Sequence, residues 1–197
     1  MITNDREYRG FEMRAEEEGM TVTGYAAVFN SPTVLYEDGE TQYKEQVDRN
    51  AFANAQMADV VMNYNHQGKP VARTKNGTLS LTTDDIGLKI SADLSGTEEG
   101  RRLFEEIRGG YIDKMSFAFT VSEEAYDNGS HTRTINGIKR LYDVAAVDIP
   151  VYDQTSISAR SYFEAEAEEE KRAEARRSQV ERIKSILGVN EDGKQND

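Results

Sequence analysis

Cysteine is absent from the 197 residues of the chain. Its absence excludes a disulfide scaffold, a zinc site with thiolate ligands and a cysteine nucleophile. Histidine occurs only twice, at His66 and His131, which argues against a metal centre built from several histidines. An imidazole base would have to be one of these two residues. We expect no metal ion and no organic cofactor.

Long apolar runs are also missing, and none approaches the ~20 residues that a helix needs to cross a bilayer. The first ten residues contain four charged side chains and no apolar stretch of the kind found in signal peptides. We therefore expect a soluble, intracellular protein without a membrane partner. The net charge of −12 argues against a nucleic-acid partner, because affinity for phosphates comes from Lys and Arg.

Residues 8–160 have the β-branched and aromatic content that is typical of strands, and we predict that they form the folded body. The clearest alternation lies in residues 111–122, with one large apolar face and one face of small residues. The apolar face would hold Met115, Phe117, Phe119 and Val121, and the small face Ser116, Ala118, Thr120 and Ser122. Further strands are predicted at 20–29, 59–65, 78–83, 86–94 and 141–149, the last of them ended by Pro150.

Turns and helices are expected between these strands. Asn128-Gly129 and Asn136-Gly137 predict turns, because both residue types tolerate a positive φ. Asp48 is expected to cap a short helix over residues 50–57, and a second helix is predicted over residues 95–108, ended by Gly109-Gly110. Many short strands with two helices predict an α+β fold with a mainly antiparallel sheet. The pattern alone does not distinguish a barrel from a sandwich.

The composition changes at Ser161. Residues 161–187 are rich in Glu, Ala and Arg, and they predict a solvated helix. Its apolar residues gather near the end and would form one short apolar face, made of Val180, Ile183, Ile186 and Leu187. We interpret residues 161–197 as a charged helical tail with a docking or self-association surface, followed by a disordered segment at 190–197.

Ser116 and His66 are the first candidates for chemistry. A serine hydroxyl becomes a nucleophile when a base removes its proton, and neutral imidazole is the usual base near pH 7. His66 stands at a predicted strand end before a Gly/Pro loop, where a side chain is held firmly and stays accessible. The plainer interpretations are a serine that fills a tight spot beside the core and a histidine that caps a turn. His131 lies in a predicted hairpin loop and is a weaker candidate.

Asp143 is the candidate for the third group. It alternates with apolar residues of the last strand, so we expect it on an apolar face, where a carboxylate needs a partner. A histidine ring N–H would be such a partner and would fix the tautomer of the ring. Asp148 faces the other way and is the alternative, and a salt bridge to Arg or Lys would explain either carboxylate equally well.

Two other patterns are rejected as sites. Asp84-Asp85 together with Asp93 lacks the spacing of a calcium loop, and a hairpin turn explains the pair. Gly96 and Gly100 precede a helix but lack the lysine and the glycine spacing of a phosphate loop.

The order of these features is more specific than any one of them. In sequence they are Asn65-His66 at a strand end, the Gly68-Lys69-Pro70 loop followed by Arg73, Ile86-Gly87-Leu88 in a hairpin, the helix at 97–108, Gly110-Tyr111-Ile112, Met115-Ser116-Phe117-Ala118-Phe119, the strand at 141–147, Pro150, and Ser156-Ile157-Ser158-Ala159-Arg160. This series resembles the prohead (capsid maturation) proteases of tailed phages, which are related to the herpesvirus assemblins. The resemblance covers residues 8–160.

The resemblance implies a herpesvirus-protease-like β-barrel with flanking helices over residues 1–160. It implies a serine endopeptidase that acts inside assembling proheads in the bacterial cytoplasm. Its substrate would be the scaffold, or the scaffold-like arm of the major capsid protein, and self-cleavage belongs to the same expectation. Assemblins are activated by dimerising, so the resemblance also implies a homodimer as a further possible arrangement.

The resemblance also implies roles for residues. His66 matches the family's histidine and Ser116 its serine. The third member is usually acidic, commonly Glu, in the strand after the serine, and Asp143 occupies that place, with Asp148 as the alternative.

Two other functions stay open. A non-catalytic scaffold or adaptor could keep the protease fold and bind capsid protein through the tail. Such a protein would be free to lose His66 or Ser116, and both are present. An unrelated β-rich hydrolase would act on small esters without a capsid partner.

Overall fold

The computed structural model describes residues 7–16, 19–148 and 157–187. The chain divides into two compact units, residues 1–160 and residues 161–197. The strands are β1 (Glu7–Ala15), β2 (Thr21–Val28), β3 (Thr33–Asp38), β4 (Thr41–Val47), β5 (Val61–Tyr64), β6 (Gln67–Arg73), β7 (Leu79–Thr83), β8 (Gly87–Asp93), β9 (Lys114–Asp127) and β10 (Thr132–Val147). The helices are η1 (Thr74–Asn76), which is a single 3-10 turn, α1 (Glu98–Arg108) and α2 (Ile157–Leu187).

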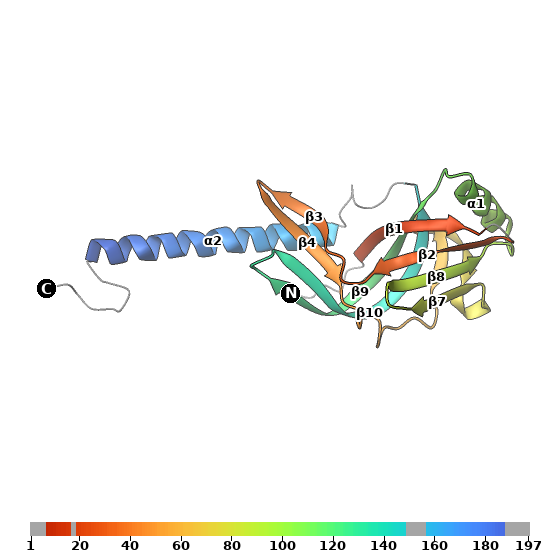
Figure 1. The fold of residues 1–197 in the computed structure, drawn as a ribbon, viewed down its shortest axis with the longest axis horizontal. Coiled ribbons are helices and arrows are strands. Elements are labelled where there is room, and N and C mark those ends of the chain that lie inside the picture. Colours follow the sequence, from red (N-terminus) through yellow and green to blue (C-terminus); the bar gives the residue numbers. More distant parts are fainter. Residues whose placement is uncertain (1–6, 17–18, 149–156, 188–197) are drawn as a thin grey trace. The chain divides into compact units, whose positions relative to one another are not determined.

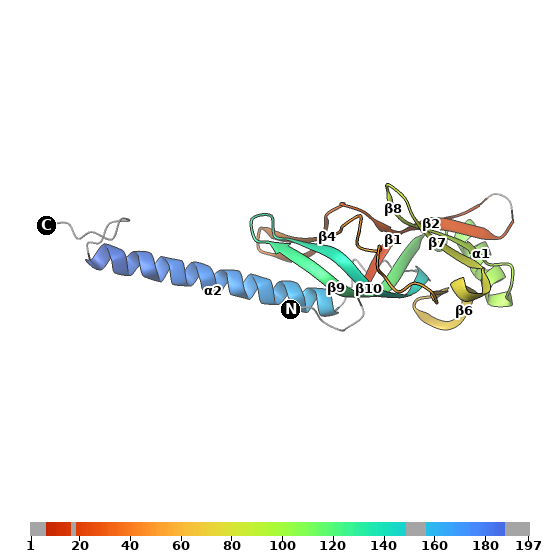
Figure 2. The same cartoon turned by 90° about the horizontal axis from the view of Figure 1, so that it is seen from below.

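All described strands belong to one sheet with the order β3-β4-β10-β9-β1-β2-β8-β7, and β5 and β6 branch from β10. Most pairs are antiparallel, and β10 pairs in parallel with β4 near its start and with β5 near its end. Figure 1 shows the long β9–β10 hairpin beside β1, with α1 at one end of the first unit and the β3–β4 hairpin at the other. The view from below adds β6 at the α1 end (Figure 2).

The described strands do not close into a barrel. The sheet path ends at β3 on one side and at β7 on the other, and neither strand has a second neighbour among the described residues. The mainly antiparallel α+β architecture is therefore confirmed, whereas the barrel is not found. The physical reason lies in pairing, because a barrel needs its first and last strands to hydrogen-bond to each other.

One hydrophobic core lies on a single face of β9 and β10. Phe117 stacks on Phe119 with 4.7 Å between ring centroids, and Phe52 contacts Phe117 from a neighbouring loop. Val22 of β2 and Ile90 of β8 belong to the same buried cluster. The sheet therefore curls around a common core. The predicted apolar face of β9 is confirmed.

The predicted strands at 20–29, 59–65, 78–83, 86–94 and 111–122 correspond to β2, β5, β7, β8 and β9, with shifted ends. The strand at 141–149 is the second half of β10, and its last residue and Pro150 lie outside the described residues. The sequence analysis missed β1, β3, β4 and the first half of β10. The turn at Asn128-Gly129 is confirmed, since Asp127 Oδ1 accepts from the Gly129 N–H at 2.9 Å.

The helix α1 begins where the sequence predicts it within a few residues. The side chain of Thr97 caps it by accepting a hydrogen bond from the Gly100 N–H at 2.9 Å. Its buried face holds Leu103, Phe104 and Ile107, and Gly110 follows with φ +73°. The other predicted helix, at residues 50–57, is wrong.

Residues 49–54 form consecutive turns instead of that helix. The backbone of this segment bonds to β10, because Ile138 N donates to Ala51 O and Gln56 N donates to Lys139 O. These tertiary hydrogen bonds replace the i→i−4 bonds that a helix would need.

Two predicted loops lie inside strands. Asn136-Gly137 falls within β10 at a register shift, where a Cβ on Gly137 would come within 2.7 Å of Ser122 Oγ. Glycine is needed there for the close approach of two strands rather than for a turn. The predicted Gly68-Lys69-Pro70 loop lies in β6, which among the described strands pairs only with β5. Proline is tolerated in β6 because an edge strand can lack a ladder N–H.

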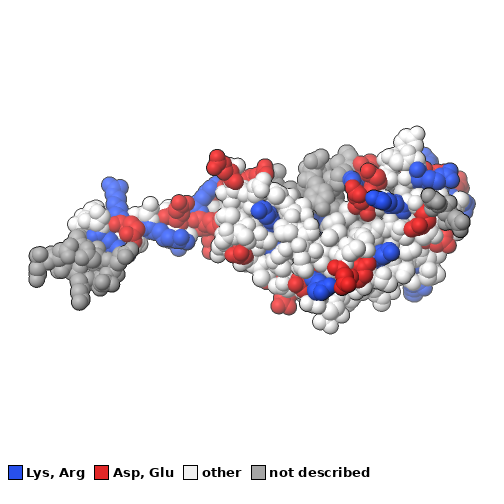
Figure 3. All heavy atoms as spheres, viewed as in Figure 1, with Lys and Arg blue, Asp and Glu red and all other residues white. Residues whose placement is uncertain are grey.

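In the second unit the described residues, 161–187, all belong to helix α2. It confirms the predicted helix over 161–187, and Val180, Ile183 and Ile186 are exposed on it. The predicted disorder at 190–197 lies outside the described residues. No helix in the described ranges is long and apolar enough to cross a membrane. On the face drawn in Figure 3, acidic and basic side chains are interspersed over the first unit, so the net charge of −12 is not gathered there in one patch.

Candidate active site

A β-bulge in β10 determines the direction of Asp143. Leu141 pairs with Phe119 and Asp143 pairs with Ala118, so Tyr142 is an extra residue on this strand. Residues that face each other across an antiparallel pair point to the same side. Leu141 therefore joins the core, while Asp143 points to the opposite face. The sequence analysis placed both residues on one apolar face, and the bulge makes that placement wrong.

His66 lies in a two-residue hairpin turn between β5 and β6. Tyr64 pairs with Gln67, and the two residues between them, Asn65 and His66, have φ angles of +49° and +57°. This is the pattern of a type I′ turn, which prefers Asn at its first central position and Gly at the second. Histidine in the left-handed region costs about 1–2 kcal/mol relative to an ordinary conformation. The turn therefore carries a side chain that its backbone does not favour.

The His66 ring and the Asp143 carboxylate are in direct contact. Nδ1 of His66 lies 2.5 Å from Oδ1 of Asp143, and the two side chains are 15% and 9% exposed. A carboxylate in this position accepts a hydrogen bond from Nδ1–H and leaves the lone pair on Nε2, which is the tautomer that a general base requires. Asp148, the alternative, is exposed and accepts a hydrogen bond from Tyr64 Oη at 3.2 Å.

Ser116 shares the face of Asp143. It pairs with Ala145 on β10, and Asp143 is two residues from Ala145, which makes Ser116 and Asp143 diagonal neighbours. Such neighbours are about 7–8 Å apart, enough for one imidazole ring between them. Ser116 is fully buried, and its Oγ makes no hydrogen bond to a described residue, including His66. The structure thus joins His66 to Asp143 and puts Ser116 on the same face without a serine–histidine hydrogen bond.

Asn63 and Thr120 lie on this face too, and the sequence analysis did not identify Asn63. Asn63 of β5 pairs with Ala145, which in turn pairs with Ser116. Asn63 is 7% exposed and Thr120 4%, and both Asn63 Oδ1 and Thr120 Oγ1 are buried without a hydrogen-bond partner among the described residues. No sequence pattern indicates Asn63, because its place on this face depends on the pairing of β5 with β10.

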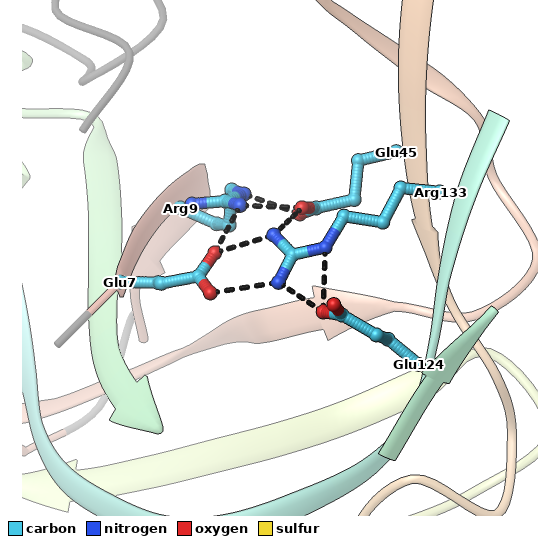
Figure 4. A network of polar contacts seen from close by, with 5 residues as sticks. All are labelled: Glu7, Arg9, Glu45, Glu124 and Arg133. Carbon is cyan, nitrogen blue, oxygen red and sulfur yellow. Dashed lines mark hydrogen bonds and ion pairs between the residues drawn. The ribbon is translucent and has the colours of Figure 1, made fainter. Parts of the chain in front are cut away.

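A second polar feature, which the sequence analysis also missed, is a network of five charged residues, of which Glu124 is half-buried and the other four are buried (Figure 4). Arg133 of β10 binds Glu7 with both terminal nitrogens, at 2.8 and 2.9 Å, and also contacts Glu124 and Glu45. Arg9 of β1 binds Glu45 of β4 through two hydrogen bonds of 2.5 and 2.6 Å. Because β1 and β4 are separated by two strands in the sheet, this network links strands that do not pair with each other.

The network fixes the charges of its members. Burial alone would raise the pKa of Glu7, but the hydrogen bond from Arg133 and the charges of Arg9 and Arg133 outweigh it and lower that pKa. Burial would lower the pKa of Arg9 and of Arg133, and the neighbouring carboxylates raise both instead. All three groups therefore stay ionised at neutral pH.

A cavity of about 500 Å³ lies between the β5–β6 hairpin and α1. Tyr64, Val71 and Leu103 line it together with the Lys69–Glu99 ion pair of 3.1 Å. Tyr64 follows Asn63 in β5, so their side chains point to opposite faces. None of Ser116, His66 and Asp143 lines this cavity.

The weaker sequence candidates have structural roles. His131 lies in the β9–β10 turn with φ +49°, and its ring packs 5.2 Å from that of Tyr43. Asp84 accepts hydrogen bonds from the N–H groups of Ile86 and Gly87, as the hairpin-turn interpretation predicts. Within the described ranges, no three His, Asp or Glu side chains gather as metal ligands.

A serine and an aspartate on one sheet face, with a histidine ring in contact with the aspartate, are the groups of a serine hydrolase. The chain belongs to the Caudovirus prohead serine protease family, whose model matches residues 9–170. The family makes this protein a serine peptidase of phage proheads. No curated protein and no solved structure matches the chain. The relation to herpesvirus assemblins stays a prediction.

Proposed function

We propose that the protein is a serine endopeptidase that cleaves scaffold, or the scaffold-like arm of the major capsid protein, during prohead maturation in the host cytoplasm. Residues 1–160 form its catalytic domain, with Ser116 as nucleophile, His66 as base and Asp143 as the group that orients the base. The observation that carries this proposal is the 2.5 Å contact between His66 Nδ1 and Asp143 Oδ1 on the face that holds Ser116. Family membership supports the reaction class.

The chemistry is acyl transfer. Nε2 of His66 takes the proton of Ser116 as Oγ attacks the peptide carbonyl, and His66 then gives that proton to the leaving amine. Water hydrolyses the acyl-serine in the second half of the reaction, with His66 again as base. Asp143 accepts a hydrogen bond from the Nδ1–H group throughout, without taking its proton, and stabilises the imidazolium that forms in each half.

The burial of Ser116 requires one further step. Its side chain has no exposed surface and no hydrogen bond to His66, so a peptide reaches it only after groups over this face move aside. Catalytic hydrogen bonds often tighten only when substrate is bound. A protease of this kind has to stay inactive until the shell is complete, and a buried nucleophile fits that requirement.

We propose that the tail, residues 161–197, attaches the enzyme to scaffold or shell. The support is its change in composition and the exposed apolar residues Val180, Ile183 and Ile186 near the end of α2. Self-cleavage would release the catalytic domain from this attachment. Self-association of the chain as a homodimer is the other use that such an apolar face has.

The proposal is tested by co-expression with a major capsid protein that carries a scaffold-like arm. Intact mass spectrometry of both chains should reveal cleavage by the wild type and by Ser122→Ala, an exposed serine on the same strand. Ser116→Ala and His66→Ala should leave both chains whole. Processing that continues in Ser116→Ala would refute the mechanism, and whole chains with wild-type protein in complete proheads would favour the non-catalytic adaptor.

A further inference from the structure

Three buried polar atoms lie on the face of the sheet that is opposite the core, and none has a hydrogen-bond partner among the described residues. They are Ser116 Oγ, Thr120 Oγ1 and Asn63 Oδ1. Ser116 has an assigned role as nucleophile, whereas Asn63 and Thr120 have none. A buried amide oxygen without a partner costs about 1–3 kcal/mol. Asn63 is therefore a poor choice for stability, and its position needs another explanation.

Asn63 stands in one cross-strand row with the nucleophile. It pairs with Ala145 on β10, and Ala145 pairs with Ser116 on β9. The three side chains point to the same face, with the small methyl group of Ala145 between the other two. Ala118, which pairs with Asp143 and is a diagonal neighbour of Ala145, is equally small. The side chains between Asn63 and Ser116 are therefore short, with the unpaired amide oxygen on one side and the serine hydroxyl on the other.

We propose that Asn63 binds the backbone of the substrate, with Oδ1 accepting the N–H of a peptide residue beside the scissile bond. This inference rests on the proposed function, because it needs Ser116 as nucleophile. Asn63 is the substrate-binding member of the site, and its unpaired oxygen gains its partner when the peptide is bound. A peptide backbone offers one N–H per residue, so the contact would hold any sequence in register with Ser116.

The spacing agrees with this role. Two strand spacings separate Asn63 from Ser116, which is roughly 9–10 Å. A peptide that lies over Ala145 would span this distance in three steps. Ser116 Oγ approaches the carbonyl carbon to about 3 Å, and one extended residue adds about 3.3 Å. The hydrogen bond from the next N–H to Asn63 Oδ1 adds about 2.9 Å. Together these lengths come to roughly 9 Å. The distance between Asn63 and Ser116 is too long for Asn63 to reach the oxyanion itself. It suits a hydrogen bond to the N–H of the substrate residue next to the scissile bond.

The test compares Asn63→Leu, which keeps the size of the side chain and removes its polar atoms, with Thr120→Val as the matched control. Thr120 is four residues from Ser116 on the same face of β9 and is equally buried and unpaired. The substrate is a ten-residue peptide centred on the bond that wild type cleaves in co-expressed capsid protein. A set of analogues replaces single N–H groups near that bond with ester oxygens.

For Asn63→Leu we expect a 10- to 100-fold lower kcat/KM, mainly through a higher KM, with a thermal unfolding midpoint that is unchanged or raised. Thr120→Val should match its midpoint and keep wild-type kcat/KM. One ester analogue should be a poor substrate for wild type, and Asn63→Leu should cleave that analogue and the parent peptide equally well.

Three results would overturn the inference. The first is a thermal unfolding midpoint several degrees lower in Asn63→Leu, which would make the residue structural. The second is a kcat/KM of Asn63→Leu within twofold of wild type. The third is a loss of kcat/KM with the ester analogues that is the same in wild type and in Asn63→Leu. The first applies even if no substrate is cleaved. Cleavage by Ser116→Ala would instead refute the proposed function, so the two failures are distinguishable.

Discussion

Ser116 and Asp143 are diagonal neighbours on one face of the β9–β10 hairpin, because the extra residue Tyr142 turns Asp143 away from the core. The His66 ring contacts Asp143 from the β5–β6 turn. The candidate triad thus depends on two local irregularities, a bulge in one strand and a left-handed turn after another. Both are sites where the backbone departs from its preferred form to aim a side chain.

The first prediction separates Asp143 from Asp148. Asp143→Asn should lower kcat by about 10⁴-fold, because an amide beside Nδ1 favours the wrong tautomer of His66. Asp148→Asn should change kcat little, since this exposed carboxylate accepts a hydrogen bond from Tyr64, whereas the His66 ring contacts Asp143. The measurement is the rate of peptide cleavage by each purified variant. Equal losses in the two variants would remove Asp143 from its role.

The second prediction concerns the turn at His66. Both His66→Gly and His66→Ala should be inactive, because both lack the base. The glycine variant should be more stable than the alanine variant by about 1 kcal/mol, since φ +57° is strained for alanine and free for glycine. Urea unfolding of the pair measures the difference. An alanine variant as stable as the glycine variant would contradict the type I′ turn.

The sequence predicts the parts of this fold in which apolar residues recur at the spacing of a strand or a helix. The alternation of Met115, Phe117 and Phe119 against Ser116 and Ala118 identified both the strand and its core face. The helix predicted over residues 95–108, ended by Gly109-Gly110, matches α1 to within a few residues. In these segments local pattern and tertiary packing agree, so a one-dimensional argument is sufficient.

The parts that could not be predicted depend on residues distant in sequence. The bulge at Tyr142 follows from pairing with β9, and no pattern in residues 141–149 indicates it. The segment at 50–57 bonds to β10 instead of forming a helix, for the same reason. For the candidate site, the sequence and the resemblance supplied His66, Ser116 and Asp143, whereas Asn63 became visible only when β5 and β9 were found on either side of Ala145.

The third prediction concerns acid stability. The pKa of Glu7 is lowered below its ordinary value of 4.5 in the folded protein. A depressed carboxyl pKa contributes stability that is complete above the unfolded value and is lost as pH falls through the folded value. Glu7→Gln should therefore be less stable than wild type by about 3–5 kcal/mol above pH 5, and the difference should shrink below pH 4.5.

The control for this prediction is Glu40→Gln, which changes an exposed glutamate. Its free energy of unfolding should follow that of wild type within about 0.5 kcal/mol at every pH. A constant difference between Glu7→Gln and wild type from pH 7 to pH 3 would mean that Glu7 is not ionised in the buried network. Urea unfolding at each pH provides the numbers.

The fourth prediction concerns the tail. Deleting residues 161–197 should leave the first unit folded, because all described strands and the main core lie in residues 7–148. The same deletion should abolish incorporation into proheads. Circular dichroism of the truncated protein and immunoblots of purified proheads measure the two outcomes. Normal incorporation of the truncated protein would refute an attachment role for the tail.

The central claim is that His66 activates Ser116. Its most direct test is the site and rate of reaction with a fluorophosphonate, followed by peptide mass spectrometry on wild type, His66→Ala and Ser122→Ala. We predict a single adduct, on Ser116, at the same rate in wild type and Ser122→Ala and at least a hundredfold more slowly in His66→Ala. An adduct on another serine, no adduct in wild type, or equal labelling of Ser116 with and without His66 would contradict the account.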